Sequence, residues 1–317
     1  MKSCTVSLQA GSWFEAFYTL IENYICDWLL PEWLAIKPAS TEKYGSIKGT
    51  INSLGLHTVC VEAHCPNMSE CWSGGTATFM ILGDLCTRGC TFCAVHKSAR
   101  GSVIDNDEPA KLARVVKEWG LNYLVITSVA RDDLQDQGST HFSNCVSEIK
   151  KFNPNTLIEV LIPDFQGRTE CLNDIIKSHP DVIGHNIETV ERLSPYARDK
   201  RANYRQSLLL LKKSKEIDKS IYTKSALMLG IGESEEEVVT ALKDLRSSGV
   251  DFVAIGQYLR PSPHHIEVKE YVRPERFESI KEIALGMGFK YVAAGPFVRS
   301  SYKAGEYFIS SIVKAKS

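Results

Sequence analysis

Six of the ten cysteines in this 317-residue chain lie between positions 60 and 93, in two groups of three. The second group, Cys86, Cys90 and Cys93, has the spacing C-x3-C-x2-C and directly follows an apolar run. Three thiolates on one short loop can bind three irons of a four-iron cluster and leave the fourth iron without a protein ligand. A structural zinc ion takes four protein ligands instead, commonly as two C-x2-C pairs. The spacing therefore predicts an iron–sulfur cluster with one open coordination position.

The first group has the spacing C-x4-C-x5-C and is formed by Cys60, Cys65 and Cys71. It also offers three thiolates on a compact loop, with no fourth cysteine nearby. His57 and His64 could complete a zinc site, so zinc stays an alternative for this group. The other four cysteines are scattered in or beside predicted helices and are expected to be ordinary thiols: Cys4, Cys26, Cys145 and Cys171.

The charge balance of the chain bears on its partners. Lys and Arg number 37 against 38 Asp and Glu, so the formal net charge is −1 and the pI is about 6.7. This balance argues against a protein that binds nucleic acid through bulk charge. The chain contains no uncharged apolar run long enough to span a bilayer. We therefore expect neither a nucleic-acid partner nor a membrane span.

The N-terminal residues 5–34 are rich in aromatic and apolar side chains and contain acidic residues but no arginine. This composition differs from that of a secretory signal or a mitochondrial transit peptide. Apolar residues recur at helical spacing from Trp13 to Leu29, which predicts an amphipathic helix that packs on the body of the protein. With no export signal recognised, we expect a cytoplasmic protein. In that reducing compartment, clustered cysteines bind metal or do redox chemistry rather than form structural disulfides.

Beyond residue 75, short apolar runs alternate with amphipathic helical patterns. Strands are expected over 76–83, 122–127, 157–162, 181–187, 221–229 and 251–257. Helices are expected over 108–119, 141–151, 168–178, 204–216, 233–247 and 274–287. Continuous apolar strands that alternate with helices indicate a parallel sheet covered on both faces. Six such units and a short run at 290–293 predict an α/β fold, an incomplete (β/α)6 barrel of the TIM type, because a complete eight-unit barrel needs more chain than remains.

We divide the chain into three parts on this basis. Residues 1–75 are expected to form an N-terminal helical extension with the loop of the first cysteine group. Residues 76–288 form the partial barrel, and residues 289–317 form a C-terminal segment. In such barrels the chemistry lies at the carboxyl ends of the strands. Because the second cysteine group directly follows the first predicted strand, it is expected at this mouth of the barrel.

The surroundings of both cysteine groups resemble those of a known family. The segment GDLCTRGCTFCAV (83–95), with an aromatic residue before its last cysteine, resembles the radical S-adenosylmethionine superfamily. Together with the C-x4-C-x5-C group ahead of it, it resembles the lipoyl synthase family in particular. The likeness covers roughly residues 30–310 and continues through VITSVARDDL (125–134), EVLIPDF (159–165), GHNIETVERL (184–193), TKSALMLGIGE (223–233), GQYLRPS (256–262) and AGPFVRSSY (294–302).

The resemblance implies a sulfur-insertion enzyme. Its substrate would be an octanoyl group that is amide-linked to a lysine of a carrier protein, and its product the lipoyl group. One electron would cleave S-adenosylmethionine to methionine and a 5′-deoxyadenosyl radical, which takes hydrogen from the unactivated carbons C6 and C8. Acid–base residues cannot do this, because alkyl C–H bonds are not usefully acidic, so the cofactor carries the difficult step.

The resemblance also implies how two [4Fe–4S] clusters are held. Cys86, Cys90 and Cys93 would hold the radical cluster, whose fourth iron binds the amino and carboxylate groups of S-adenosylmethionine. The first cysteine group would hold an auxiliary cluster that serves as the sulfur donor. In the family its fourth ligand is a serine of the RSSY motif, which falls on Ser301 here, with Ser300 as the alternative. An oxygen ligand on iron is harder and more weakly held than a thiolate, which suits a cluster that is dismantled.

Several polar residues near the expected barrel mouth are candidates for contact with the cofactor, although helix caps or salt bridges explain them as well. The candidates are Ser128, Arg131, Asp132, Asn186, Glu188 and Lys224. Arg88 and Arg299 flank the two cluster motifs and could offset cluster charge. His264 and His265 lie in a loop rich in proline and serine, and we expect them to be solvated.

The resemblance also points to partners and leaves rivals. The carrier would be the lipoyl domain of a 2-oxoacid dehydrogenase or a glycine-cleavage H-protein, and reduced ferredoxin or flavodoxin would supply electrons. A biotin synthase-like enzyme does not account for the C-x4-C-x5-C group. A tRNA methylthiotransferase brings a basic RNA-binding domain for which no chain remains. A non-catalytic zinc or iron–sulfur module is the rival from another class, and it is disfavoured by the missing fourth ligands.

Overall fold

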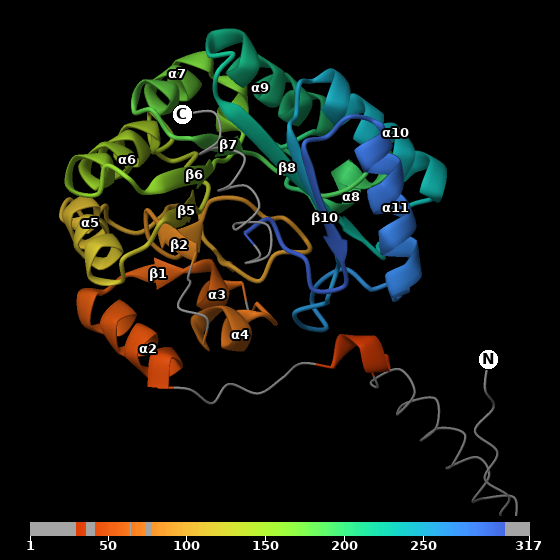
Figure 1. The fold of residues 1–317 in the computed structure, drawn as a ribbon, viewed down its shortest axis with the longest axis horizontal. Coiled ribbons are helices and arrows are strands. Elements are labelled where there is room, and N and C mark those ends of the chain that lie inside the picture. Colours follow the sequence, from red (N-terminus) through yellow and green to blue (C-terminus); the bar gives the residue numbers. More distant parts are fainter. Residues whose placement is uncertain (1–29, 36–41, 64, 74–77, 302–317) are drawn as a thin grey trace, which may run out of the picture. The chain divides into compact units, whose positions relative to one another are not determined.

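The computed structural model describes residues 30–35, 42–63, 65–73 and 78–301 (Figure 1). By its internal contacts the chain divides into two compact units, Met1–Ala35 and Ile36–Ser317. The described element of the first unit is the short helix η1 (Glu32–Leu34). The amphipathic helix expected between Trp13 and Leu29 lies outside the described residues. Both cysteine groups belong to the second unit.

The main sheet of the second unit has eight strands in the order β1-β2-β5-β6-β7-β8-β9-β10. They are β1 (His57–Thr58), β2 (Thr78–Ile81), β5 (Tyr123–Ser128), β6 (Leu157–Leu161), β7 (Val182–Gly184), β8 (Tyr222–Leu229), β9 (Phe252–Gln257) and β10 (Tyr291–Gly295). Strand β1 is antiparallel to β2, and all other neighbours are parallel. Within the described residues β1 and β10 are the two ends of the sheet, so the incomplete barrel is confirmed. The run at 290–293 is part of a seventh parallel strand, β10.

Helices cover the outer face of the sheet (Figure 1). They are α5 (Glu108–Glu118), α6 (Ser139–Phe152), α7 (Thr169–Lys177), α9 (Tyr204–Ile217), α10 (Glu235–Ser247) and α11 (Pro274–Gly286). Local sequence fixes where they begin. The Ser234 side chain accepts the Glu237 backbone N–H, and the Glu237 side chain accepts the Ser234 N–H, which is a capping box for α10. The Asn203 side chain likewise accepts the Gln206 N–H and caps α9.

Apolar side chains pack both between the sheet and its helices and inside the barrel. A cluster of Tyr123, Val125, Val182, Tyr222 and Phe252 lies near the amino ends of the strands, where the Tyr222 and Phe252 rings stack with centroids 5.1 Å apart. The amino end of the barrel is therefore packed, and the carboxyl ends carry the loops that can do chemistry. Among the described residues, the structure contains no helix that is both long and apolar enough to cross a membrane.

Short elements carry the two cysteine groups and the loops around them. The first group lies on α3 (Val59–Glu62), α4 (Met68–Ser73) and the loop between them, and α2 (Glu42–Leu54) contacts α4. The second group begins in β3 (Leu85–Cys86), which pairs in parallel with β4 (His96–Lys97). The remaining short helices follow the ends of β6 and β7: η2 (Phe165–Gly167), η3 (Glu191–Leu193) and α8 (Ser194–Ala197).

Candidate active site at the mouth of the barrel

The loop of Cys86, Cys90 and Cys93, called here the radical-cluster loop, is tied to the loops that follow three different strands. The Thr87 N–H donates to the Ala130 carbonyl (3.0 Å), after β5, and the Thr91 N–H donates to the Ala197 carbonyl (2.8 Å), after β7. From the loop after β9, the Ile266 N–H donates to the Thr91 carbonyl (3.2 Å). The loop therefore lies across the carboxyl ends of the strands, as the sequence predicts.

Arg88, in the middle of this loop, is buried and bound by two carboxylates. Its guanidinium donates to Asp132 (2.8 and 2.9 Å), and a nitrogen lies 2.6 Å from Asp164 Oδ1. Burial alone would raise the pKa of Asp132, but hydrogen bonds and the charge of Arg88 outweigh this effect and hold that pKa at about 2. Arg88 is thus neutralised by the protein. It fastens the loop to the ends of β5 and β6, and our expectation that it offsets cluster charge stays a prediction.

The thiols of this loop are free and receive backbone hydrogen bonds. The Asp199 N–H donates to Cys90 Sγ (3.3 Å), and the Val95 N–H hydrogen-bonds to the Cys93 sulfur. Burial raises the pKa of Cys93 to about 12 and also raises that of Cys90. Without metal these groups are neutral thiols, so a metal that binds them must displace their protons.

The first cysteine group lies beside the C-terminal segment. The Asn67 side chain donates to the Phe297 carbonyl (2.6 Å), and the charge of Cys65 acts on Arg299, whose pKa is lowered by burial. Ser300 and Ser301 follow directly in the chain. Segments more than two hundred residues apart in sequence therefore meet at this group, and the serine-containing motif begins there.

The histidines that could complete a zinc site at the first group give it little support. His57 Nδ1 lies 3.5 Å from Glu62 Oε1 and so has a carboxylate partner, while His64 lies outside the described residues. The Cys60 thiol is buried, and burial raises its pKa to about 11. Among the described residues, neither cysteine triplet is a tight group with all ligand atoms within 4.8 Å of one another. A wider separation is what a polynuclear cluster requires, because each thiolate binds a different iron.

At Gly256 in β9 the C-terminal segment passes close to the barrel. A Cβ atom at this position would overlap the Val298 carbonyl oxygen and crowd Arg299 Nη1. We expect Gly256→Val to push residues 298–301 away from the first cysteine group. The variant should lose iron from that group while it keeps iron at the radical-cluster loop. Iron content and Mössbauer spectra of Gly256→Val and of the control Gly45→Ala, where a Cβ meets nothing within 4 Å, check this prediction; equal iron in both variants would contradict it.

Three of the residues predicted to contact the cofactor lie near the radical-cluster loop and have polar side-chain atoms that could bind a ligand. Ser128 ends β5, and its hydroxyl oxygen is buried with no hydrogen-bond partner among the described residues. Asn186 and Glu188 follow β7, and the Asn186 side chain hydrogen-bonds to Glu188. Burial raises the pKa of Glu188, against the opposing charge of Arg198, and the Glu188 charge acts on Cys90.

The other three are held by protein partners. Asp132 binds Arg88, as described. Arg131 donates to both oxygens of Asp133 (2.9 and 3.0 Å). Lys224 was expected at the mouth, but it is the third residue of β8 and its ammonium donates to both Glu159 oxygens (2.9 and 3.0 Å) in the barrel interior. This expectation is corrected. Lys224 lies near the start of β8, so its side chain enters the barrel interior far from the carboxyl ends of the strands.

Arg198 is a site residue that the sequence analysis missed. It follows α8, is buried, donates to Ser207 Oγ (2.8 Å), and its charge acts on both Cys90 and Glu188. A buried cation beside a thiol and a carboxylate can bind an anionic ligand group. In the sequence, Arg198 sits in a run of mixed charges, YARDKR, whose pattern resembles an exposed turn.

Comparison with known proteins places this geometry in a family. Residues 80–245 match the profile of the radical SAM superfamily. The mitochondrial lipoyl synthase of Vitis vinifera is 52% identical over 291 residues, which cover 90% of this chain and 74% of that protein. The chain belongs to the lipoyl synthase family. The apicoplast lipoyl synthase of Plasmodium yoelii yoelii is 51% identical over 284 residues. This chain spans only 57% of the length of that relative.

The fold is similar to that of a solved protein. The crystal structure of Streptococcus suis SuiB bound to S-adenosylmethionine matches with a TM-score of 0.53 at 9% identity, over 89% of this chain and 60% of that one. At this identity the match concerns the fold alone. The relatives are named for the mitochondrion or the apicoplast, so the cytoplasmic location that we expected for this family member stays a prediction.

The radical SAM superfamily implies a [4Fe–4S] cluster and S-adenosylmethionine, and the residues present fit both. Three free thiols on one loop are the donor set that a [4Fe–4S] cluster with one open position takes. The unpartnered hydroxyl of Ser128 and the buried guanidinium of Arg198 fit the polar and charged groups of S-adenosylmethionine.

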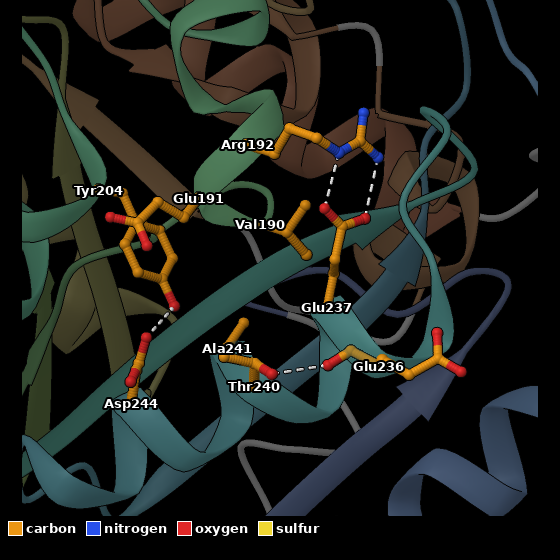
Figure 2. A pocket seen from close by; sticks show the side chains of 9 residues that line it. All are labelled: Val190, Glu191, Arg192, Tyr204, Glu236, Glu237, Thr240, Ala241 and Asp244. Carbon is orange, nitrogen blue, oxygen red and sulfur yellow. Dashed lines mark hydrogen bonds and ion pairs between the residues drawn. The ribbon is translucent and has the colours of Figure 1, made fainter.

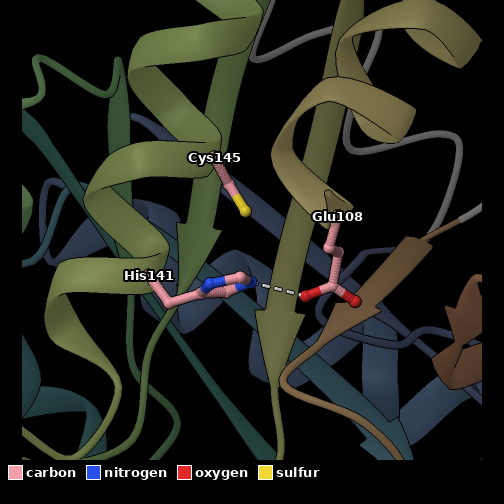
Figure 3. Close-up of side chains that lie close together, drawn as sticks. All are labelled: Glu108, His141 and Cys145. Atoms are coloured by element: carbon pink, nitrogen blue, oxygen red, sulfur yellow. Dashed lines mark hydrogen bonds and ion pairs between the residues drawn. The ribbon is translucent and has the colours of Figure 1, made fainter. Parts of the chain in front are cut away.

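A tight group of possible metal ligands is also formed by Glu108 on α5 and by His141 and Cys145 on α6 (Figure 3). Glu108 Oε2 is already used twice, because it accepts the Leu82 N–H (3.1 Å) and lies 2.6 Å from His141 Nε2. The Cys145 thiol is fully buried, and burial raises its pKa well above the usual value. We therefore interpret this group as structural: it stabilises the turn at Leu82, just ahead of the radical-cluster loop.

A cavity of about 410 Å³ lies away from both cysteine groups, between η3, α9 and α10 (Figure 2). Several of its polar groups already have protein partners: Arg192 donates to both Glu237 oxygens (2.7 and 2.9 Å), and the Tyr204 hydroxyl donates to Asp244 (3.0 Å). It has no cysteine among its lining residues, so we do not assign the reaction to it.

Proposed function

We propose that this chain is a lipoyl synthase that inserts two sulfur atoms, at C6 and C8, into an octanoyl group on a lysine of a carrier protein. One observation carries the proposal. Two separate triplets of free thiols lie on two loops of one partial barrel, and the C-terminal segment that carries Ser300 and Ser301 passes beside the first triplet. A single-cluster radical enzyme or a zinc module needs only one such site.

The residues of the radical-cluster loop would hold and orient the first cluster. When bound, a [4Fe–4S] cluster at Cys86, Cys90 and Cys93 supplies the electron that cleaves S-adenosylmethionine into methionine and a hydrogen-abstracting radical. Arg198 offers a cation for the cofactor's carboxylate, and Ser128 offers an unused hydroxyl. The Arg88 attachment to the strand ends holds the three thiols in place before any metal arrives, which reduces the ordering that binding requires.

The first cysteine group would hold the auxiliary cluster as sulfur donor. Cys60, Cys65 and Cys71 supply three ligands, and Ser301 supplies the fourth, with Ser300 as the alternative. The Asn67 contact to Phe297 and the nearness of Arg299 to Cys65 support this assignment, because both bring the serines to the thiols. Two S-adenosylmethionine molecules would be consumed for each lipoyl group, one for each carbon.

The proposed partners follow from the proposed reaction. The substrate is an octanoylated carrier, either a lipoyl domain of a 2-oxoacid dehydrogenase or a glycine-cleavage H-protein, and the electron source is reduced ferredoxin or flavodoxin. An anaerobic single-turnover assay with the iron-loaded protein, S-adenosylmethionine, dithionite and an octanoyl-lysine peptide tests the proposal. We expect a product with two added sulfurs and two 5′-deoxyadenosines per product. Deoxyadenosine without sulfur insertion would overturn the assignment as a lipoyl synthase and leave another radical activity.

Ser128→Ala should weaken the binding of S-adenosylmethionine. The variant removes one hydroxyl that is buried and unpartnered, and a hydrogen bond is worth about 1 kcal/mol, or about a fivefold rise in KM. The measurement is the KM for S-adenosylmethionine in deoxyadenosine formation, with exposed Ser279→Ala on α11 as control. An unchanged KM in both variants would show that Ser128 does not contact the cofactor.

A further inference from the structure

His265 was expected to be solvated, but the structure places it against the radical-cluster loop. Its Nε2 lies 3.1 Å from the Cys93 carbonyl oxygen, and its Nδ1 lies 2.9 Å from Ser262 Oγ. A carbonyl oxygen only accepts hydrogen bonds, so Nε2 carries the proton of the neutral ring. Nδ1 then accepts from the Ser262 hydroxyl, which fixes the ring and its tautomer. His264, the neighbouring residue, is exposed.

The contact acts on the turn that carries the third cysteine. The Cys93 carbonyl lies just ahead of Val95, whose N–H hydrogen-bonds to the Cys93 sulfur. Holding the carbonyl fixes the orientation of the Cys93–Ala94 peptide, and so restricts the Ala94 backbone that leads to the Val95 N–H. Hydrogen bonds to ligand sulfurs are among the factors that set the potential of an iron–sulfur cluster. Residues that hydrogen-bond to the ligands of a metal site, without binding the metal, orient those ligands.

His265 completes the attachment of the loop on the side opposite Arg88. Arg88 ties the Cys86–Cys90 half of the loop to the ends of β5 and β6. The segment after β9 reaches the other half through His265 and through the Ile266 N–H, which donates to the Thr91 carbonyl. No contact of this kind can be read from the spacing of the sequence, because His265 and Cys93 are 172 positions apart.

We propose that His265, fixed by Ser262, is a positioning residue that orients the Cys93–Val95 turn and thereby sets the reduction potential of the radical cluster. This inference rests on the proposed function in one respect, that Cys86, Cys90 and Cys93 hold that cluster. Loss of the Nε2 donor frees the turn and weakens the amide hydrogen bond to the sulfur. The reduced, more negative cluster is then stabilised less, so its potential becomes more negative.

The test compares three variants of the iron-loaded full-length chain. His265→Ala removes the donor, whereas His265→Gln keeps an amide N–H near the position of Nε2 without the imidazole ring. His264→Ala is the matched control in the same loop. We expect His265→Ala to show a more negative midpoint potential in an EPR-monitored titration and about tenfold slower deoxyadenosine formation. His265→Gln and His264→Ala should both stay near the wild type.

Each other outcome decides against the inference. A midpoint potential of His265→Ala equal to that of the wild type overturns it, and so does a His265→Gln variant that behaves like His265→Ala, because the donor would then not be the cause. If His265→Ala does not fold, Ser262→Ala takes its place and should shift the potential in the same direction, since it releases the tautomer. A wild-type protein that binds no cluster at the three cysteines overturns both the His265 inference and the proposed function. A wild-type protein that cleaves S-adenosylmethionine without sulfur insertion overturns only the proposed function.

Discussion

Replacing Arg88 by leucine is expected to cost the fold about 3–5 kcal/mol and to release iron from the radical-cluster loop. The substitution removes the cation and leaves the carboxylates of Asp132 and Asp164 buried beside an apolar side chain. Removal of one partner of a buried pair is costly because the remaining charge has lost its water and gains no compensation. The measurements are the free energy of unfolding in urea and the iron content after reconstitution.

Two controls make the Arg88 prediction specific. Arg192→Leu removes a bidentate pair with Glu237 at the surface, where such pairs contribute less than about 1 kcal/mol. The triple variant R88L/D132N/D164N removes all three charges and should recover most of the lost stability, because no uncompensated charge is left. A loss for Arg88→Leu no larger than that for Arg192→Leu would refute the burial argument.

The pH dependence of this loss follows from the pKa of Asp132. The folded value is about 2, below the value of about 3.9 in an unfolded chain. Stability from the ion pair is therefore fully present above about pH 4 and is lost as pH falls through about 2. The deficit of Arg88→Leu should therefore shrink as the pH falls from about 4 through about 2, because the wild type loses the ion pair there. An unfolding free-energy deficit that stays constant through this acid range would contradict the linkage.

The barrel could be predicted from the sequence because its signals are local. The strand expected over 251–257 is β9, every residue of which is buried, and a buried parallel strand is a continuous apolar run. The helix expected over 233–247 begins where Ser234 and Glu237 form their capping box. The cysteine spacing is equally local, since three ligands of one cluster lie on one loop. Each of these features needs only a few neighbouring residues to be recognised.

The support around the site could not be predicted, because it depends on which strand ends meet. Nothing near Arg88 in sequence indicates Asp164, and nothing near Cys93 indicates His265. Lys224 was misplaced for a related reason. The sequence shows that a strand is present, but it does not show how far along that strand a residue lies from the mouth of the barrel. Arg198 was missed because charged residues in a turn are usually solvated.

The prediction with the largest effect separates the two cysteine groups. Cys65→Ala should abolish formation of the sulfur-containing product but leave cleavage of S-adenosylmethionine intact. The radical-cluster loop is held by its own contacts to the ends of β5, β7 and β9, none of which involves Cys65. Cys90→Ala should instead abolish both activities. Each variant should retain about four of the eight irons of a two-cluster enzyme, and the measurements are iron content, deoxyadenosine and product mass in one anaerobic assay.

The same assay decides which serine belongs to the auxiliary site. Ser301→Ala should behave like Cys65→Ala, losing product while deoxyadenosine is still formed, and Ser300→Ala should behave like the wild type. The reverse result moves the ligand to Ser300 and keeps the proposal, because Asn67 and Arg299 hold the chain just ahead of both serines. Full product formation by both serine variants would remove the serine ligand, and full product formation by Cys65→Ala would remove the auxiliary cluster as the sulfur donor. A variant that fails to fold loses both signals together with its iron, whereas Cys90→Ala loses both signals but keeps about four irons.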